Sequence, residues 1–333
     1  MITIDISDLP DSKWNERVEK SGLGTLDQID IAAQNYLASN QKPKFLRFFD
    51  NDKNIVGQLI MSEAQRFVSQ PNKIMPTTKK RILNKILNHV PNIKKNIYRW
   101  TYGPVIFDTK QSESIFTELG KYFLEQKSQV SGWTHPLSSY KINSLKNIFK
   151  IIPWSTYLID LGLPIEELYS NLEKNNCRKN IERAKKRGVV IEQITESNLK
   201  KYFELFTKLQ TLGGQKNNYD FMLKRWNMLK SYGRSGFLAL KDGKPVSGML
   251  FSSYNGYIIE AGLARSKEDY SERLYSQDLI KWHVIEWGVK NKMRYYDLAG
   301  FNPNPISEKE RGIEKFKRKW GGKKYDYYGI NLK

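Results

Sequence analysis

Two segments of the chain share one alternation of apolar and polar positions. Residues 44–53 lead through a polar Asn-Asp turn into residues 55–60, and residues 236–244 lead through an Asp-Gly turn into residues 246–251. Both patterns predict a strand, a tight turn and a second strand, because such turn residues between alternating apolar runs are typical of β-hairpins. In both, a glycine follows the start of the second strand. One matched hairpin in each half of the chain indicates an internal duplication.

The hydrophobic pattern of the second half predicts alternating strands and helices. Gly188 stands where a glycine would cap the end of a helix. The order of elements favours an α/β fold with a mixed sheet. Strands are expected at 154–161, 189–191, 257–263 and 293–298. Residues 165–187 are expected to be largely helical, and a helix is expected from about 271 to 291.

The first half has a similar but weaker pattern. Two α/β domains are therefore expected, the first covering residues 1–150 and the second residues 151–314. Residues 128–147 are polar and weakly periodic, and the junction is placed near their end. Strands fit 45–49, 55–62 and 98–102, and helices fit 79–89 and 112–125.

Basic residues outnumber acidic ones, 55 against 35 in 333 residues, which gives a formal net charge of +20. Such a surplus favours an anionic partner such as RNA, an anionic lipid surface or a phosphorylated substrate. The alternative is a Lys-rich surface that only adds solubility. No window approaches the ~18 apolar residues of a membrane span, and the N-terminus lacks a signal-peptide pattern. We expect a soluble cytoplasmic protein whose membrane contact, if any, is peripheral.

Familiar nucleotide and metal motifs are absent from the sequence. It has no Gly-x-x-x-x-Gly-Lys-Ser/Thr loop, no Cys-x-x-Cys and no His-Glu-x-x-His, so no metal site is expected. The histidines, His89, His135 and His283, are far apart, and His283 falls in an apolar helix pattern typical of a core residue. Cys177, the one cysteine, lies within a basic helical segment. It is either a thiol activated by a neighbouring guanidinium or a small buried residue.

A strongly basic helix is expected around residues 174–188. Arg178, Lys179 and Arg183 lie on it at helical spacing. A helix of this charge favours phosphate, to which arginine adds bidentate geometry. The alternative is a solvated basic face. These residues are our candidate phosphate contacts.

The C-terminal segment interleaves aromatic and basic residues. Phe316 and Trp320 are four apart and share a helix face, which predicts packing. Lys317 would then be held beside apolar rings, where a partly desolvated ammonium stabilises an oxyanion better than one in water. The alternative is a helix whose lysines face solvent. Upstream, Asp297 and Asn302 belong to a strand end and loop, which suits a binding site or a turn-capping carboxylate.

These features together resemble the Fem family of non-ribosomal peptidyltransferases. Residues 312–322, Gly-Ile-Glu-Lys-Phe-Lys-Arg-Lys-Trp-Gly-Gly, are similar to that family's Gly-(Ile/Leu)-x-x-Phe-Lys-x-x-Phe-Gly-Gly. Residues 296–300, Tyr-Asp-Leu-Ala-Gly, resemble its Tyr-Asp-Leu-Gly-Gly, and residues 178–188 resemble its Arg-x-Asn-Ile-Arg-Lys-Ala-x-x-x-Gly helix. Ala299 and Trp320 are mild departures from the family pattern. The resemblance is sparse in the first 95 residues.

The resemblance implies two GNAT-like domains with mixed sheets, the tail 315–333 returning to the first domain, and no long helical arm. It implies a cofactor-free enzyme that moves an amino acid from aminoacyl-tRNA to an amine of a phosphorylated or lipid-linked peptidoglycan precursor in cell-wall synthesis, with possible peripheral contact at the inner membrane face. The family's catalytic lysine matches Lys317, and Phe316 matches the residue beside it. Lys317 would stabilise the oxyanion that forms when the amine attacks the aminoacyl ester.

Two other functions remain open. An acyl-CoA-dependent N-acyltransferase could have the same fold. GNAT domains of that kind cradle the CoA pyrophosphate with a glycine-containing loop before a helix, and residues 265–273 contain no glycine. A non-enzymatic basic RNA-binding protein would need no ordered Lys317.

Overall fold

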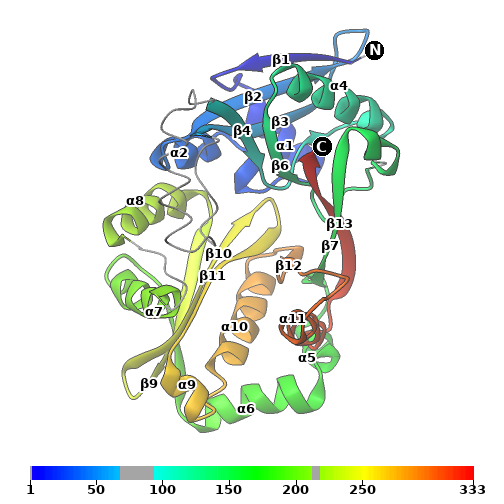
Figure 1. Cartoon of the computed structure of the whole chain (residues 1–333). Helices are drawn as coiled ribbons and strands as arrows, with labels where there is room; N and C mark the ends of the chain where they lie inside the picture. Colours follow the sequence, from blue (N-terminus) through cyan, green and yellow to red (C-terminus); the bar gives the residue numbers. More distant parts are fainter. Residues whose placement is uncertain (1, 68–93, 141, 212–217) are drawn as a thin grey trace, which may run out of the picture. The chain divides into compact units, whose positions relative to one another are not determined.

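The described strands form one mixed β-sheet of 13 strands, and each half of the chain contributes one half of it together with helices that cover it (Figure 1). The computed structural model describes residues 2–67, 94–140, 142–211 and 218–333. The helix expected at 79–89, with His89, lies outside the described residues. Two units divide the chain: unit 1 is Met1–Ser21, Asp27–Ile152 and Gly329–Lys333, and unit 2 is Gly22–Leu26 and Pro153–Tyr328.

In unit 1 the strands follow the order β1-β2-β3-β4-β6-β13, and β5 pairs with β3. Neighbours are antiparallel except β4 and β6, which are parallel. The strands are β1 (Thr3–Ser7), β2 (Lys42–Phe49), β3 (Ile55–Phe67), β4 (Lys94–Trp100), β5 (Val105–Ile106), β6 (Gln129–Trp133) and the end of β13 (Lys323–Leu332), which belongs to unit 1 from Gly329 onward. The helices are α1 (Trp14–Ser21), α2 (Ile31–Ala38) and α4 (Ser112–Glu125).

In unit 2 the strands follow the order β8-β9-β10-β11-β12-β7, and β13 runs beside β7. The strands are β7 (Phe149–Asp160), β8 (Val189–Gln193), β9 (Arg234–Lys241), β10 (Lys244–Tyr254), β11 (Tyr257–Arg265) and β12 (Tyr295–Asp297). The helices are α5 (Ile165–Asn171), α6 (Lys179–Lys186), α7 (Leu199–Thr211), α8 (Tyr219–Leu229), α9 (Lys267–Ser271), α10 (Ser276–Lys290) and α11 (Glu308–Arg318).

The two halves of the sheet follow the same sequence of pairings. In unit 2, as in unit 1, three antiparallel pairs are followed by one parallel pair, β11 with β12, and one antiparallel pair. The parallel strands are connected through α4 in unit 1 and α10 in unit 2, as a crossover requires. Each predicted hairpin also has a register shift after its turn, which leaves Val56 unpaired in β3 and Val246 unpaired in β10. The two units therefore repeat one order of pairings, which supports the predicted internal duplication.

Residues 165–187 are largely helical, as predicted, but they do not form one continuous helix. The chain forms α5, a π-helical turn at Lys174–Arg178, and α6. It breaks at Leu172, whose ψ is 142°, and the next N–H, that of Glu173, donates to the Lys319 carbonyl oxygen at 2.9 Å. Gly188 ends α6 with φ +72°, as predicted for a cap.

The second long helix begins later than expected. α10 starts at Ser276, because Arg273 and Tyr275 have φ of +53° and +57°, outside helical geometry. The Asp269 carboxylate accepts the Ser276 N–H at 3.0 Å. No helix in the described part of the chain is long and apolar enough to cross a membrane.

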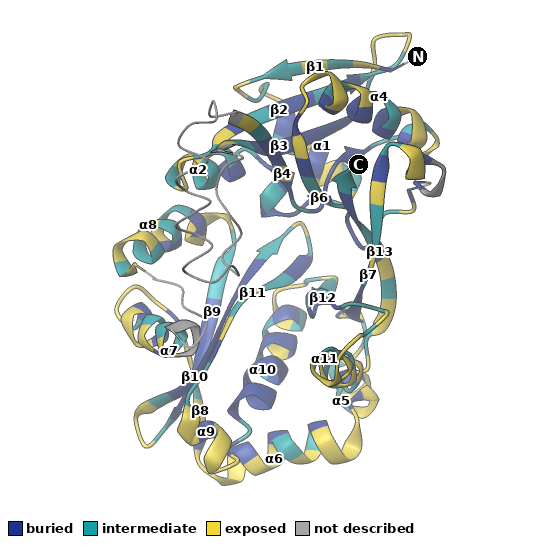
Figure 2. Ribbon diagram, viewed as in Figure 1, coloured by how far each residue is buried: buried dark blue, intermediate teal, exposed yellow. Residues whose placement is uncertain are grey.

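The unit 2 sheet buries both of its faces. α10 packs on one face, where Met249, Phe251 and Ile258 contribute to the core. α7 covers the other face, where Tyr202 and Leu250 lie in a second cluster that α8 completes. Figure 2 shows the resulting contrast between the largely buried α10 and the exposed α6.

Candidate active site

The site begins where β11 and β12 separate. The two strands pair only over Tyr257–Ile259 and Tyr295–Asp297. Beyond this pair β11 continues along β10, whereas the chain after β12 turns into a loop. The register between β10 and β11 shifts at this point, so that Ala261 is unpaired. The sheet therefore opens just beyond Ile259.

Lys317 of α11 reaches the loop that leaves β12. Its Nζ donates to the Ala299 carbonyl oxygen at 2.8 Å and also to that of Leu298. Burial lowers the pKa of Lys317 to about 8; the Glu260 carboxylate opposes this shift, the Lys281 ammonium adds to it, and the Asp297 carboxylate opposes it. A protonated amine is thus held close to its titration point at the strand opening.

The two carbonyls leave part of the Lys317 ammonium unused. A lysine ammonium has three N–H donors, and in the described residues these carbonyls are its hydrogen-bond acceptors. Fixed donors in a desolvated site stabilise charge that develops in a transition state. The arrangement can therefore offer a third N–H to an oxyanion.

Two other buried lysines pack around Phe316. Lys281 pairs with Glu260, and their side chains are 3% and 14% exposed. Lys319 pairs with Asp278, and it also donates to the Asn176 carbonyl oxygen at 3.0 Å. The Phe316 ring lies 5.7 Å from the Lys281 Nζ and 4.3 Å from the Lys319 Nζ.

The carboxylates of β11 and α10 are what sequence reasoning missed. Glu260 accepts a hydrogen bond at 2.8 Å from the hydroxyl of Tyr296, which is fully buried. Lys281 and Asp278 lie on the largely buried part of α10, where a buried charge needs a partner. That pattern was the available signal. Both helix charges find opposite partners, from β11 and from the segment after α11.

Asp297 is fully buried and holds the loop that Lys317 contacts. It accepts hydrogen bonds from the Tyr257 hydroxyl at 2.7 Å, the Thr156 hydroxyl at 2.5 Å and the Ala299 N–H at 2.9 Å. These contacts fix the strand end and so fix the carbonyl acceptors of Lys317. A direct contact of Asp297 with a substrate stays a prediction.

Asn302 joins the same loop to α11. Its side-chain amide donates to Glu310 Oε2 at 3.3 Å, and its Oδ1 accepts the Asn304 N–H at 3.0 Å. Glu310 also accepts the Ile306 N–H at 2.7 Å. Asn302 is half-buried, and its role in substrate binding stays a prediction.

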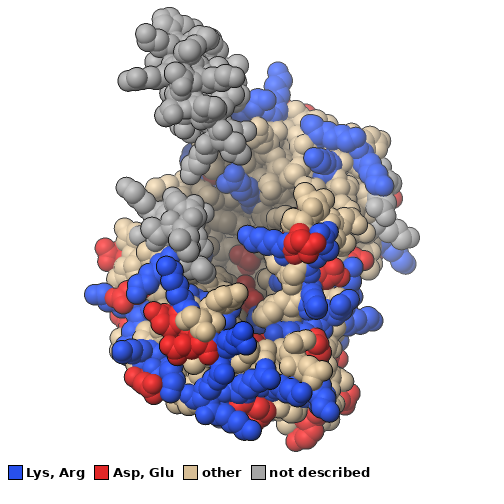
Figure 3. Space-filling view, turned by 60° about the horizontal axis from the view of Figure 1, so that its bottom comes forward, with Lys and Arg blue, Asp and Glu red and all other residues tan. Residues whose placement is uncertain are grey.

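The candidate phosphate contacts lie around α6. Lys179 and Arg183 are exposed, and Arg178 is half-buried with a buried Nε that lacks a hydrogen-bond partner in the described structure. The Arg183 guanidinium lies 5.7 Å from the Tyr275 ring centroid. Figure 3 shows Lys and Arg side chains gathered on the forward face of the molecule. Within the described chain none of these three residues forms a hydrogen bond or an ion pair with Lys317.

The remaining polar candidates of the sequence are not placed for catalysis. Burial lowers the pKa of His135 to about 3, which keeps it neutral. The expectation that His283 is a core residue is wrong, because its side chain is 41% exposed and faces Glu286. Cys177 is fully buried, and burial raises the pKa of its thiol to about 12, as fits the structural role. No group of three potential metal ligands occurs in the residues that are described.

The N-terminus of α10 is occupied by the protein itself. The buried Asp269 carboxylate accepts the Ser276 N–H at 3.0 Å and pairs with Arg265. The Ser276 hydroxyl donates to Ser247 Oγ at 2.6 Å. A helix N-terminus attracts one anion, and here an internal carboxylate holds that position.

Comparison with solved structures identifies the fold. The crystal structure of FemX matches with a TM-score of 0.67 and 12% identity, over 97% of this chain and 96% of that one. The structure of L-PGS from Bacillus licheniformis matches with a TM-score of 0.55 and 11% identity, over 96% of this chain and 91% of that one. A tandem GNAT protein from the clavulanic acid biosynthesis pathway matches with a TM-score of 0.53 and 10% identity, over 99% of this chain and 98% of that one.

No family model matches the sequence, and no curated protein matches it. At sequence identities of 10% to 12%, the structural likeness shows the fold alone. The chain has the two-domain GNAT-like fold of FemX, with mixed sheets, as the resemblance implied. Between Gly188 and Gly236 the described residues hold β8, α7 and α8, and no long helical arm.

Proposed function

Starting from this acyltransferase fold, we propose that the protein transfers an amino acid from aminoacyl-tRNA to an amine of a cell-envelope precursor peptide. The observation that carries the proposal is the Lys317 ammonium, half-desolvated and anchored on two backbone carbonyls where β11 and β12 part. Phe316 and Asp297 act through position, by packing α11 and by holding the Ala299 loop.

The reaction follows from this placement. The acceptor amine attacks the ester carbonyl, a C–N bond forms, and the carbonyl oxygen becomes an oxyanion that accepts the third N–H of Lys317. The ester C–O bond then breaks, and the proton lost by the amine passes to the departing ribose oxygen directly or through water. An ester is already activated, so the step needs no strong protein base.

The charge distribution supports an anionic donor and an anionic acceptor. The surplus of +20 includes the exposed Lys179 and Arg183 of α6, which suit contacts with an RNA backbone or a diphosphate. A lipid-linked acceptor would bring the protein to the inner face of the cytoplasmic membrane. The catalytic step itself would take place in the cytoplasm, where aminoacyl-tRNA is found.

An acyl-CoA-dependent N-acyltransferase is the second candidate, favoured by the likeness in fold to a tandem GNAT protein. The buried Asp269 at the start of α10 argues against it, since a pyrophosphate bound there would face a carboxylate. A non-enzymatic RNA-binding protein is disfavoured by the cost of burying Lys317, a cost that simple RNA binding does not require.

Donor binding tests the proposal. Purified protein is titrated with aminoacylated tRNA, uncharged tRNA and acetyl-CoA at low and moderate salt. We expect preference for the aminoacylated form, reduced about 3–10-fold in Lys317→Ala, because the ammonium contacts the ester carbonyl. Lys315→Ala, on the exposed side of α11, is the matched control and keeps the preference. Saturable acetyl-CoA binding with indifference to tRNA charging would instead support the acyl-CoA-dependent enzyme.

A further inference from the structure

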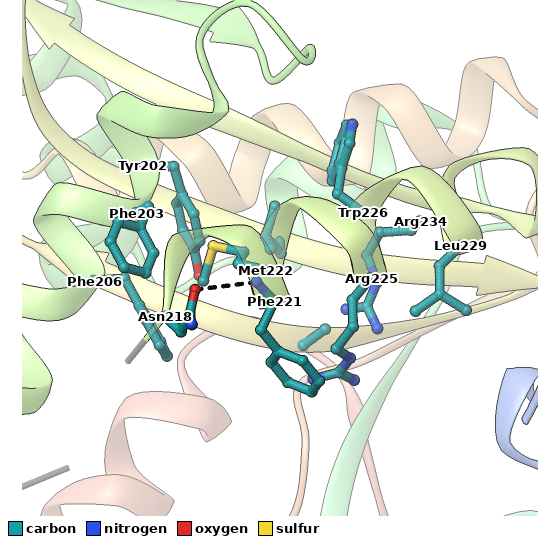
Figure 4. Close-up of a pocket in the computed structure, with 12 residues that line it drawn as sticks. Tyr202, Phe203, Phe206, Asn218, Phe221, Met222, Arg225, Trp226, Leu229 and Arg234 are labelled. Atoms are coloured by element: carbon teal, nitrogen blue, oxygen red, sulfur yellow. Dashed lines mark hydrogen bonds between the residues drawn. The ribbon is translucent and has the colours of Figure 1, made fainter. Parts of the chain in front are cut away.

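A cavity opens on the sheet face opposite α10. It measures about 330 Å³ and lies among α7, α8 and strands β9 to β11 (Figure 4). Sites for small ligands typically enclose about 300–1,000 Å³. Tyr202 and Phe206 come from α7, and Phe221, Arg225 and Trp226 from α8.

The floor of this pocket is a short stretch of β11 with small side chains. Ala261 lines it and is exposed, because β11 has lost its β12 neighbour after Ile259. A Cβ atom on Gly262 would lie 2.6 Å from the Tyr202 hydroxyl oxygen, so glycine is needed there. The residue before Ala261 is Glu260, which pairs with Lys281 on the α10 side. The pocket is therefore one residue along the strand from the candidate active site.

Tyr202 is one of the polar residues that line the pocket, together with Asn218, Arg225 and Arg234. Tyr202 is fully buried, and in the described structure its hydroxyl has no hydrogen-bond partner. Burial raises the pKa of Tyr202, and the positive charge of nearby Arg234 opposes the shift. Burying an unpaired hydroxyl costs stability, so a ligand atom that pairs with it has a ready contribution to binding.

The rim carries an aromatic face and cations. Phe221 is 37% exposed, and the Arg225 guanidinium carbon lies 5.8 Å from the centroid of its ring. Figure 4 shows these two side chains beside each other on α8, and Arg234 also lines the pocket. Flat aromatic and guanidinium groups stack on nucleic-acid bases, and guanidinium groups also bind phosphate.

We propose that this pocket binds a nucleoside phosphate. The base would enter among Phe206, Phe221 and Trp226, with a polar atom of its edge on the Tyr202 hydroxyl and its phosphate at Arg225. An alkyl chain would fill the same apolar space but would leave that hydroxyl unpaired, so the base is favoured. The source could be a free nucleotide or the terminal nucleotide of an RNA donor; the second source rests on the proposed function.

Calorimetric titration with adenosine monophosphate and uridine monophosphate tests the proposal. Three comparison ligands each lack one part of the nucleotide. Adenosine lacks the phosphate, ribose 5-phosphate lacks the base, and decyl phosphate carries an alkyl chain in place of the nucleoside. We expect saturable binding of at least one nucleoside monophosphate, weaker binding of each fragment, and weaker binding of decyl phosphate.

Three substitutions locate that binding in the pocket. Tyr202→Phe removes only the hydroxyl and should weaken nucleotide binding about 3–10-fold without lowering thermal stability, because no protein hydrogen bond is lost. Phe221→Ala should weaken it at least about fivefold through lost stacking. Arg225→Gln should weaken it and reduce its salt dependence. Tyr270→Phe, at a tyrosine that is 73% exposed outside the pocket, is the matched control.

Decyl phosphate that binds as tightly as the nucleotides, or nucleotide binding indifferent to all three substitutions, would overturn the proposal. So would the lack of any saturable nucleotide binding at millimolar concentration. Competition then separates the sources. Displacement of the nucleotide by intact tRNA but not by tRNA lacking its terminal nucleotide identifies the RNA end, whereas displacement by neither identifies a free nucleotide. Because free-nucleotide binding requires no transfer activity, its failure and failure of the proposed function are separate results.

Discussion

Lys317 is held in a state that folding alone would not favour. Burial disfavours its charge and lowers its pKa to about 8, and its anchors are the backbone carbonyls of Leu298 and Ala299. Lys281 and Lys319, which are also buried, each have a carboxylate partner. A partly desolvated lysine that has no ion-pair partner among the described residues is the kind of group found at functional sites.

The titration of Lys317 should appear in the rate of transfer. With an acceptor amine that is already neutral at pH 7, we expect the rate constant to fall as the pH rises through about 8, because the ammonium that stabilises the oxyanion is lost. Lys317→Arg keeps its charge in this range, so any activity it retains should lack the alkaline fall. A fall with the same midpoint in Lys317→Arg would contradict the assignment.

The titration of Lys317 should also appear in the pH dependence of the protein's folding stability. The folded pKa of Lys317, about 8, lies below its ordinary value of 10.5. Between these values the unfolded chain binds more protons than the folded one, so this group's contribution to stability rises with pH. Compared with Lys317→Met, the wild-type protein should therefore gain stability as the pH is raised from about 8 toward 10.5, as measured by thermal unfolding.

At this scale the sequence predicted some residues and missed others. Lys317 and Phe316 became candidates through the resemblance of residues 312–322 to the Fem motif, and the helix spacing of Phe316 and Trp320 added to it. Glu260 and Lys281 were missed because their pairing joins residues 21 positions apart, and no local pattern shows which charge of α10 faces which charge of β11. Asp297 was found as a strand-end carboxylate, but its burial depends on Thr156 and Tyr257, which come from other strands.

At the scale of elements, α11 is placed by the turn that ends it. Trp320 is buried, and Gly321 follows with φ +73°. The Glu173 N–H donates to the Lys319 carbonyl oxygen at 2.9 Å, which ties the start of the π-helical turn to this corner. The Gly-Gly pair of the motif thus has a structural reason: a Cβ on Gly322 would lie 2.8 Å from the Leu158 carbonyl oxygen.

Gly321→Ala should displace α11 and weaken the fold. A Cβ at this position would lie 2.6 Å from the Asn171 carbonyl oxygen, and the left-handed backbone alone costs about 1–2 kcal/mol for alanine. We expect a loss of at least that free energy of unfolding in a denaturant titration, together with loss of transfer activity. Gly312→Ala is the control, because its Cβ meets nothing within 4 Å in the middle of α11 and should stabilise by about 0.5–1 kcal/mol. Equal stability of the two variants would refute this account of the corner.

Elements with local signals were predicted well, and those set by tertiary contacts were not. Both hairpins and the helix Ser112–Glu125 occur where the turn residues and apolar periodicity placed them. The break at Leu172 was missed because its cause is a hydrogen bond to Lys319, far along the chain. Strand β6 was missed because it lies in a polar segment and is defined by pairing with β4 and β13.

At the scale of the whole chain, duplication and charge carry the functional argument. The matched order of pairings in the two units, down to the unpaired Val56 and Val246, supports descent of the two units from one domain. The charge of +20 was readable from composition. The pocket beneath α7 and α8 was not, because the sequence pattern did not assign those helices and the pocket exists only where they meet β11.

Single-turnover transfer tests the central claim most directly. Aminoacyl-tRNA labelled in its amino acid is mixed with excess protein and a lysine-containing stem peptide, and the label is followed from tRNA to peptide. The account predicts transfer by the wild-type protein and by Lys315→Ala, and a loss of about 100-fold or more in Lys317→Ala, the scale of removing one oxyanion donor. Transfer at an undiminished rate in Lys317→Ala, or acetylation of the same peptide from acetyl-CoA with no use of aminoacyl-tRNA, would contradict it.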